Sequence, residues 1–261
     1  MNTRVTRLNL LLLLSASLWM ASCQKKTKGD DADPGAPSPV EIRFKHMAGS
    51  FRNLVYDSAY PVTPAGTPTF VKINTFKYYI SNIQLVDAKT GDTVKIPDTY
   101  FLVDHGNAQS LRPQFMVPAG EYYNLSFLIG IDANRNFNGP KTGALDPALG
   151  MYWNATDGYI MAKMEGTSPS STLPGNVFTF HVGGVKDPHS VLAMRHFKLG
   201  GNVSIQPNKK TVINISTDAL AWFSNPHPIS LSTPITGPGD LSNKMAENYF
   251  KMFDFISVTF E

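Results

Sequence analysis

Short runs that alternate between apolar and polar residues, separated by glycine and proline, constrain the fold of this chain most. In 40–45 the apolar residues are Val40, Ile42 and Phe44, and in 123–131 every odd-numbered residue is apolar. Alternation with a period of two is typical of strands that bury one face. The 20 glycines and 19 prolines, spread through the chain, indicate many turns between such strands. The pattern predicts an all-β protein.

The run 76–86 changes phase in its middle. The apolar residues are at even positions at first, 76, 78 and 80, and then at odd positions, Ile83 and Leu85. One extra residue would keep both groups on the same face of the strand, which predicts a β-bulge near 81–82. Ser242 is expected to cap a short helix that ends before Phe255, and 218–223 is expected to form a turn. Further strands are expected at 69–73, 99–103, 158–164, 177–182, 191–199, 211–216 and 256–261. Together these elements predict an antiparallel β-sandwich with long loops and one or two short helices.

The chain has one cysteine, Cys23, and its surroundings resemble a bacterial lipoprotein signal. Arg4 and Arg7 precede an apolar run, and small residues lie directly before the cysteine. We expect residues 1–22 to be a signal peptide, 23–40 to be the lipidated cysteine with a disordered tether, and 41–261 to be one domain. The alternative is an ordinary signal peptide with an incidental cysteine. The lipid would anchor the protein in the cell envelope, in the outer membrane, facing either the periplasm or the outside.

Charge and motif content argue against two classes of function. The formal net charge of +3 falls to +1 when the two arginines of the signal leave, which gives no basis for nucleic acid binding. The sequence has no nucleophile elbow, zinc-protease motif, phosphate loop or dinucleotide fingerprint. We therefore expect a protein that is not an enzyme.

Nine stretches between residues 76 and 184 resemble, in the same order, hallmark stretches of the copper-binding MbnP-like proteins. They are Phe76–Ile83, Tyr100–Asp104, Val117–Tyr122, Phe127–Asp132, Thr142–Pro147, Gly150–Trp153, Gly158–Ile160, Lys163–Gly166 and Phe180–Gly184. The resemblance extends over roughly 41–216. It implies a secreted or lipid-anchored sandwich that holds copper through histidine nitrogens. In some relatives a tryptophan oxidised to kynurenine contributes, and a partner di-haem protein of the cytochrome c peroxidase type is associated with that oxidation.

His46 and His181 are the candidate copper ligands, because both lie in family-like stretches and imidazole suits copper. They are 135 residues apart, so only the fold could bring them together. The alternatives are a core histidine at 46 and a plain strand end at 181. Trp153 is the candidate neighbour of the metal, although relatives often carry a second aromatic residue where this chain has Ala155.

The remaining histidines have no partner at a chelating spacing. We expect His105 to be a surface residue at a strand end, His196 to be structural, and His189 and His227 to be solvated.

A weaker candidate is a calcium loop, in which Asp132, Asn134 and Asn136 would donate oxygens at alternate positions. Phe137 occupies the place of the usual glycine, and no glutamate closes the loop. Asx turns explain the segment equally well.

The alternative function is a cell-surface sandwich that binds a glycan or a protein partner. Its candidate platform is a set of aromatic residues, Tyr78, Tyr79, Tyr122, Tyr123, Tyr152 and Trp153.

Overall fold

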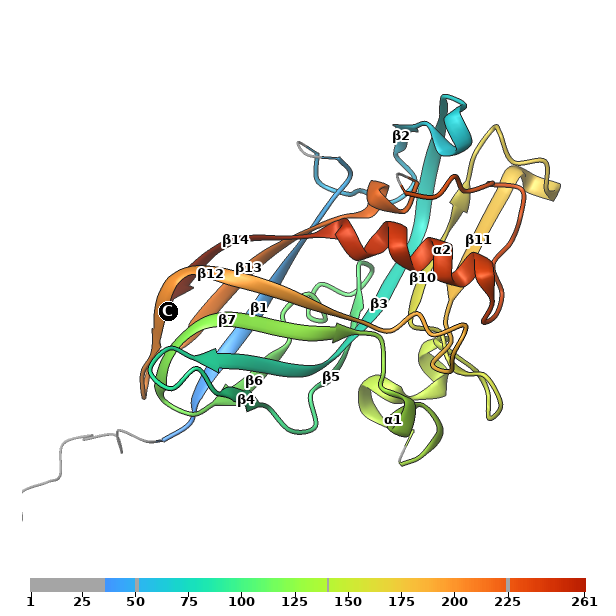
Figure 1. Ribbon diagram of the computed structural model, residues 1–261. Coiled ribbons are helices and arrows are strands. Elements are labelled where there is room, and N and C mark those ends of the chain that lie inside the picture. The colour runs from blue at the N-terminus through green and yellow to red at the C-terminus, as the bar shows by residue number, and fades with distance from the viewer. Residues whose placement is uncertain (1–35, 50–51, 140, 224–225) are drawn as a thin grey trace, which may run out of the picture. The chain divides into compact units, whose positions relative to one another are not determined.

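The computed structural model describes residues 36–49, 52–139, 141–223 and 226–261, and these form two packed β-sheets (Figure 1). The predicted signal peptide and Cys23 lie outside the described residues. The all-β prediction is confirmed. Within the described ranges, the structure contains no helix long and apolar enough to cross a membrane.

The smaller sheet has four strands in the order β14-β13-β1-β6. Their bounds are β1 Ser38–Met47, β6 Gln114–Val117, β13 Thr211–Asp218 and β14 Phe253–Phe260. One pair departs from the antiparallel prediction, because β1 runs parallel to β13, with Val40 opposite Thr211. Parallel neighbours need a long connection, and here the whole larger sheet lies between the two strands in the chain.

The larger sheet has eight strands, with β11-β10-β3-β7-β12 in order and β2, β4 and β5 paired to β3. Their bounds are β2 Ala59–Val62, β3 Thr69–Asp87, β4 Thr93–Lys95, β5 Tyr100–Asp104, β7 Gly120–Ile129, β10 Ala162–Thr167, β11 Val177–Val182 and β12 Ala193–Ile205. A separate hairpin pairs β8 (Tyr152–Asn154) with β9 (Gly158–Tyr159). The two expected strands at 69–73 and 76–86 are one continuous strand, β3.

The predicted bulge is confirmed in β3. The register with β7 shifts between Ser81 and Gln84, and Asn82 adopts a positive φ of 52°. Both parities of apolar residues are consequently buried, with Ile80 and Ile83 both fully inaccessible.

Helices are short and few among the described residues. The two α-helices are α1 (Ala133–Phe137) and α2 (Asp240–Tyr249), and the 3-10 turns are η1 Pro64–Gly66, η2 Gly143–Leu145, η3 Pro147–Leu149, η4 Pro174–Asn176, η5 Ala219–Phe223 and η6 Phe250–Met252. The expected turn at 218–223 is η5. The predicted cap is wrong by several residues, because α2 begins after Gly239 and the Ser242 hydroxyl instead donates to the Gly237 carbonyl.

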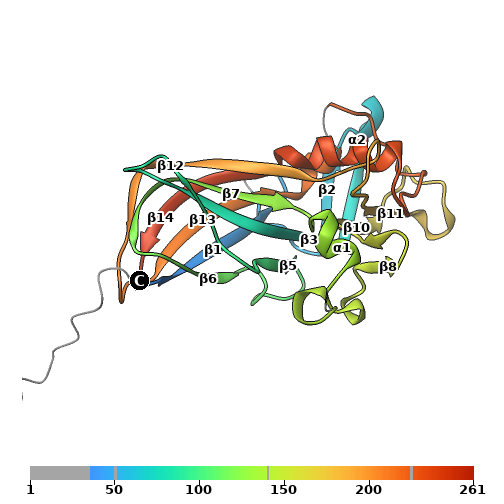
Figure 2. The same ribbon diagram turned by 60° about the horizontal axis from the view of Figure 1, so that its bottom comes forward.

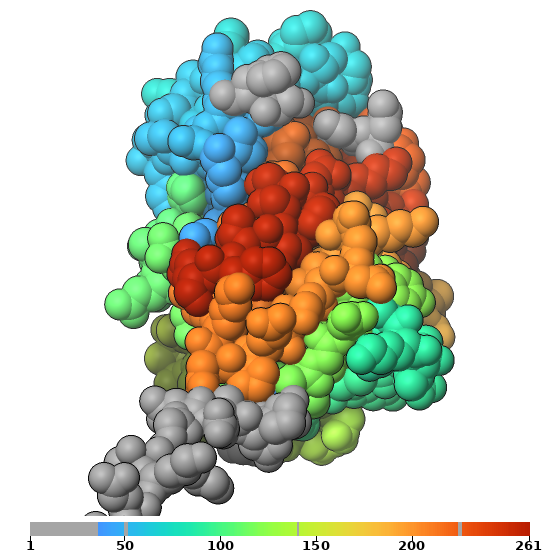
Figure 3. All heavy atoms as spheres, turned by 90° about the vertical axis from the view of Figure 1, so that its left-hand side faces the viewer, coloured from blue at the N-terminus to red at the C-terminus, as the bar shows by residue number. Residues whose placement is uncertain are grey.

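Aromatic side chains fill the space between the two sheets. Phe44 of β1 packs edge-on against Tyr78 of β3, with ring centroids 5.8 Å apart. Phe253 of β14 contacts Tyr78 and Phe127 in the same way. Beyond the end of the smaller sheet, Trp222 of η5 stacks on Tyr249 of α2 and continues this core. The C-terminal segment (red) lies beside β12 (orange) on the surface in Figure 3.

The opposite face of the larger sheet is covered differently. Figure 2 shows α2 on one side of the sheet and α1 with β8 on the other. On that second side, the Tyr79 hydroxyl donates to the Ala144 carbonyl and its ring meets Tyr159 edge-on. The larger sheet is therefore a middle layer with two chemically distinct faces. The first is the core face, toward Tyr78, and we name the second, toward Tyr79, the loop face.

The ordered domain starts earlier than expected. β1 begins at Ser38, inside the segment predicted to be the tether, and both Ser38 and Val40 are fully buried. Residues 38–40 pair with 115–117 of β6, which gives their backbone groups partners that a tether would lack.

Candidate functional site

His46 lies at the end of β1 and points into the core. Its side chain packs against Phe76, and the residue is only 4% exposed. Nδ1 lies 3.1 Å from Nδ1 of His105, and Nε2 lies 3.0 Å from the Tyr78 hydroxyl. Burial, with the neighbouring His105, lowers the pKa of His46 to about 3. His46 is therefore neutral and bonded at both ring nitrogens, to side chains rather than to the carbonyl expected of a core histidine.

His105 is half-buried and contacts His46, so the prediction of a surface residue is wrong. Its backbone N–H donates to the Phe76 carbonyl, which extends the pairing of β5 with β3 by one residue. This pairing brings the imidazole over the end of β1, where Tyr56 packs edge-on against it. Burial lowers the pKa of His105, against the opposing effects of Asp104 and the Leu54 backbone. No local spacing could have revealed this, because 59 residues separate the two histidines.

His181 of β11 forms a short bond with a carboxylate. Its Nε2 lies 2.6 Å from Oε1 of Glu165 on β10, and the Thr75 hydroxyl donates to Oε2 of the same carboxylate at 3.0 Å. Lys163 adds an ion pair to Glu165 at 3.4 Å. The hydrogen bond from His181 is the main cause that lowers the pKa of Glu165 to about 2. Glu165 is therefore an ionised carboxylate that accepts a hydrogen bond from the protonated ring nitrogen of His181.

The structure does not bring His46 and His181 together. His181 is in register with Lys163, and Lys163 is in register with Lys77 of β3, so all three share one face of the sheet. His46 contacts the side chains of Phe76 and Tyr78, the residues on either side of Lys77. Because neighbouring residues of a strand point to opposite faces, His46 lies on the core face and His181 on the loop face.

His181 and Trp153 do lie close together. A side-chain carbon placed on Gly183, two residues after His181, would fall 2.6 Å from Cζ3 of the Trp153 ring. The indole therefore packs directly on the backbone at the end of β11, which only glycine permits. This contact leaves Trp153 half-buried at the end of β11, two residues along the chain from His181.

The residues of the candidate calcium loop serve separate contacts. Asp132 caps α1 by accepting from the Arg135 N–H, and its second oxygen accepts from the Tyr100 hydroxyl at 2.6 Å. Asn134 Oδ1 accepts from the Asn138 amide, and buried Asn136 accepts from the Tyr159 N–H. The structure does not bring the three oxygens together as a calcium site.

The candidate aromatic platform is not assembled either. Tyr78, Tyr79 and Tyr122 are buried, whereas Tyr123 is 42% exposed. Tyr152 packs on Tyr159, with centroids 4.9 Å apart. Half of the set is buried in the core, so the six residues do not form one surface that could stack on a sugar.

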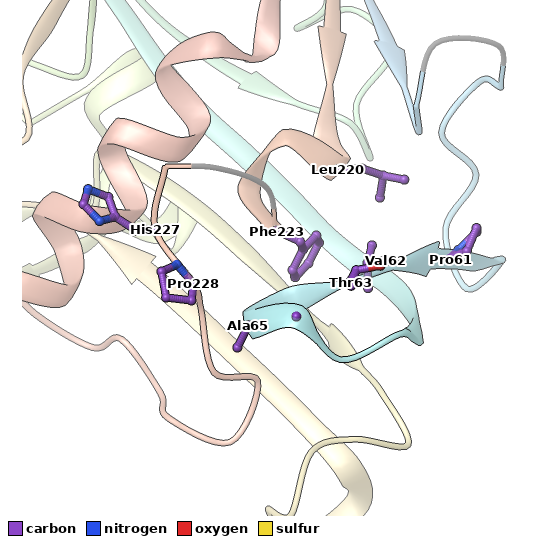
Figure 4. Close-up of a pocket in the computed structure, with 9 residues that line it drawn as sticks. Pro61, Val62, Thr63, Ala65, Leu220, Phe223, His227 and Pro228 are labelled. Atoms are coloured by element: carbon purple, nitrogen blue, oxygen red, sulfur yellow. The ribbon is translucent and has the colours of Figure 1, made fainter.

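The other histidines are peripheral. His227 is bonded to Glu247 at 2.7 Å, His189 pairs with Asp240 at 3.4 Å, and His196 is exposed on β12 instead of structural. His227 also borders a hollow of about 410 Å³ with Pro228, Phe223 and Ala65 (Figure 4). Among the described residues that line this hollow, His227 is the one titratable side chain, and it is already paired with Glu247.

The two histidine environments offer different sets of metal donors. In the part of the chain that the structure describes, no three His, Cys, Asp or Glu side chains gather as metal ligands. The loop face offers one imidazole with a carboxylate and an adjacent indole. The core face offers two imidazoles. Either set suits an ion of low coordination number better than a divalent ion that needs four ligands.

The fold and these residues define a two-sheet β-sandwich with a histidine–carboxylate pair beside a tryptophan. The chain belongs to the MbnP family, whose model matches residues 37–241. Its structure is similar to that of MbnP from Methylosinus trichosporium, with a TM-score of 0.52 and 17% sequence identity over 76% of this chain and 83% of that one. Comparison with curated proteins gives no match. The predicted family is confirmed.

Proposed function

We propose that this protein is a copper-binding protein of the cell envelope that holds copper on the loop face, with His181 as a ligand and Trp153 beside the metal. Membership of the MbnP family supports copper as the metal. The observation that carries the site is the 2.6 Å bond between His181 and Glu165, on the strand whose end at Gly183 contacts the indole of Trp153.

The carboxylate determines which nitrogen of His181 can bind. Glu165 is ionised, so it accepts a hydrogen bond from the Nε2–H of His181, and the lone pair of the imidazole is then on Nδ1. Histidine ligands of metals are commonly oriented by such a carboxylate on the other ring nitrogen. His46 lies on the core face and is not part of this site. Of the two histidines predicted as copper ligands, only His181 remains.

Trp153 is the residue on which a family-type oxidation would act. It is half-buried in a short hairpin at the surface of the loop face. We propose that a di-haem protein of the cytochrome c peroxidase type is the partner that oxidises it. The product, kynurenine, adds an aromatic amine that can serve as a further nitrogen donor to copper.

The remaining parts of the proposal concern location and activity. A lipid on Cys23 would anchor the chain to the outer membrane, and the domain would bind copper without catalysing a reaction. Radiolabelled palmitate incorporation that is abolished by Cys23→Ser tests the anchor. Incorporation that persists in the variant would contradict it.

A copper titration against a chromophoric Cu(I) chelator tests the site. His181→Asn is expected to remove one equivalent of bound copper, and Glu165→Gln is expected to weaken that equivalent by about 10–100-fold. Intact-mass analysis of the natively expressed protein reports whether Trp153 is oxidised.

Two substitutions serve as matched controls. His227 and Glu247 form a similar pair at 2.7 Å on the surface, so Glu247→Gln removes an equivalent carboxylate away from Trp153. His196→Asn removes an exposed imidazole. Both controls should keep the full copper content, and an unchanged titration of His181→Asn would reject the site.

A further inference from the structure

The loop face continues past the proposed copper site to an open area around Phe70 of β3. Four strands lie side by side there (Figure 1), and the residues in register across β2, β3, β10 and β11 are Ala59, Lys72, Thr167 and Val177. Val177 has the same parity on β11 as His181, so this row belongs to the loop face. Phe70 lies two residues before Lys72 on the same face and is 55% exposed. This part of the sheet therefore presents an uncovered aromatic ring.

A hollow of about 460 Å³ is lined by Phe70, and its volume is within the range of small-molecule sites. Besides the aromatic ring, the lining has side chains that form hydrogen bonds, namely Lys72, Thr167, Ser168 and Asn176. The hollow therefore offers an apolar surface together with polar groups that can fix the orientation of a ligand.

The polar groups have hydrogen-bonding capacity to spare. Ser170 Oγ donates to Thr69 Oγ1 at 2.7 Å, and the hydroxyls of Thr69 and Ser168 share one further bond at 3.4 Å. Three hydroxyl protons and two bonds leave one proton, on Thr69 or Ser168, without an acceptor among the described residues. Asn176 donates from its amide nitrogen to the Ser171 carbonyl, whereas its Oδ1 accepts from no described residue. A ligand with several hydroxyls would satisfy both kinds of group.

The charge of the hollow comes from one residue. Lys72 is the one charged side chain among the described residues that line it, and it forms no ion pair with any of the described carboxylates. Glu165, the carboxylate farther along this face of β10, is already held by His181 and Lys163. One free ammonium group beside an aromatic ring favours a ligand that carries a single negative charge.

We propose that this hollow binds an anionic sugar, a hexuronic acid of a glycan, with its ring on Phe70 and its carboxylate on Lys72. A pyranose ring has an apolar face of C–H groups and a rim of hydroxyls, which matches an aromatic ring among hydrogen-bonding groups. An extended peptide does not fit this area, because β3 lies between β2 and β10 and offers no free strand edge. A phosphate group does not fit either, since a single lysine is its only cation.

Titration of the ¹⁵N-labelled full chain with D-glucuronate, followed by ¹H–¹⁵N NMR, tests the proposal. Binding is expected with a Kd on the order of 1 mM and with shifts in the strands around the hollow. D-Glucose, which lacks the carboxylate, should bind about tenfold more weakly. Phe70→Ala should weaken glucuronate binding by at least about tenfold. Lys72→Gln should remove the preference for glucuronate and leave the weaker binding of glucose unchanged.

A second pair of the same residue types provides matched controls. The Lys209 ammonium lies 4.9 Å from the ring centroid of exposed Phe260, and neither residue lines the hollow. Phe260→Ala and Lys209→Gln should therefore bind glucuronate as the wild type does. All four substituted side chains are exposed, so the fold should persist, and circular dichroism checks it.

Three results would overturn the proposal. They are the absence of glucuronate binding well above about 1 mM, undiminished binding by Phe70→Ala, and equal affinity of the wild type for glucose and glucuronate. His181→Asn should keep the full affinity for the sugar, because the hollow does not include His181. The sugar site and the proposed copper site can therefore fail separately.

Discussion

Replacement of Glu165 by glutamine changes the charge of the His181 partner but hardly its size. In the native protein this carboxylate accepts from His181 and Thr75 and pairs with Lys163. The lowering of its pKa from 4.5 to about 2 corresponds to at most about 3 kcal/mol. Glu165 is 32% exposed, so solvent screening reduces the contribution to about 1 kcal/mol.

The sign of the pH dependence follows from the lowered pKa. The folded state holds Glu165 ionised more readily than the unfolded state does, so its contribution is complete above pH 4.5. It decreases as the pH falls from 4.5 to about 2. At pH 7 the variant should therefore unfold about 1 kcal/mol more easily, or about 2–4 °C lower for a domain of this size. Most of the difference should be gone at pH 2, and the rest should disappear below it.

Urea unfolding of wild type and variant between pH 7 and pH 2 measures this difference. Protonation of buried His46 also destabilises the native state below pH 6.5, but it affects both proteins equally and cancels. Glu247→Gln, whose carboxylate is 62% exposed, is the matched control and should change stability by less than about 0.5 kcal/mol. A difference for Glu165→Gln that stays constant down to pH 2 would refute the reasoning.

Two further substitutions test the packing that supports the sites. Gly183→Ala places a carbon 2.6 Å from the Trp153 ring, so we expect the free energy of unfolding to fall by about 1–3 kcal/mol. The fluorescence emission of Trp153 should shift as well. Unaltered stability and an unaltered spectrum would disprove the contact. Phe253→Ala empties a fully buried position between Phe44 and Tyr78. It should lower the free energy of unfolding, measured by heat or urea, by about 3–5 kcal/mol. A decrease below about 1 kcal/mol would show that this core is not packed as described.

Sequence periodicity predicted the strands that bury one face. Val177–Val182 was predicted to the residue, and the phase change in β3 located its bulge, because both features depend on local alternation. Strands β2, β4, β6 and β8 were missed, since runs of three or four residues are too short to show a period. α1 was missed for a similar reason, and its cap Asp132 was interpreted as a calcium donor.

The candidate site shows where sequence reasoning stops. The family resemblance predicted Trp153 as a neighbour of the metal, and the structure places its indole on Gly183, two residues after His181. It could not show that His46 and His181 point to opposite faces, since that depends on the register of β10 and β11 with β3. His105 lacked any signal in the sequence, because its partner comes from another sheet.

The parallel pairing of β1 with β13 makes the beginning of the domain depend on its end. Val40 meets Thr211 only after almost the whole domain has been synthesised, and until then β1 has only β6 as a partner. Contacts this distant in sequence form slowly. The smaller sheet should therefore assemble last during folding, and the contact between His46 of β1 and His105 cannot form before β1 has docked.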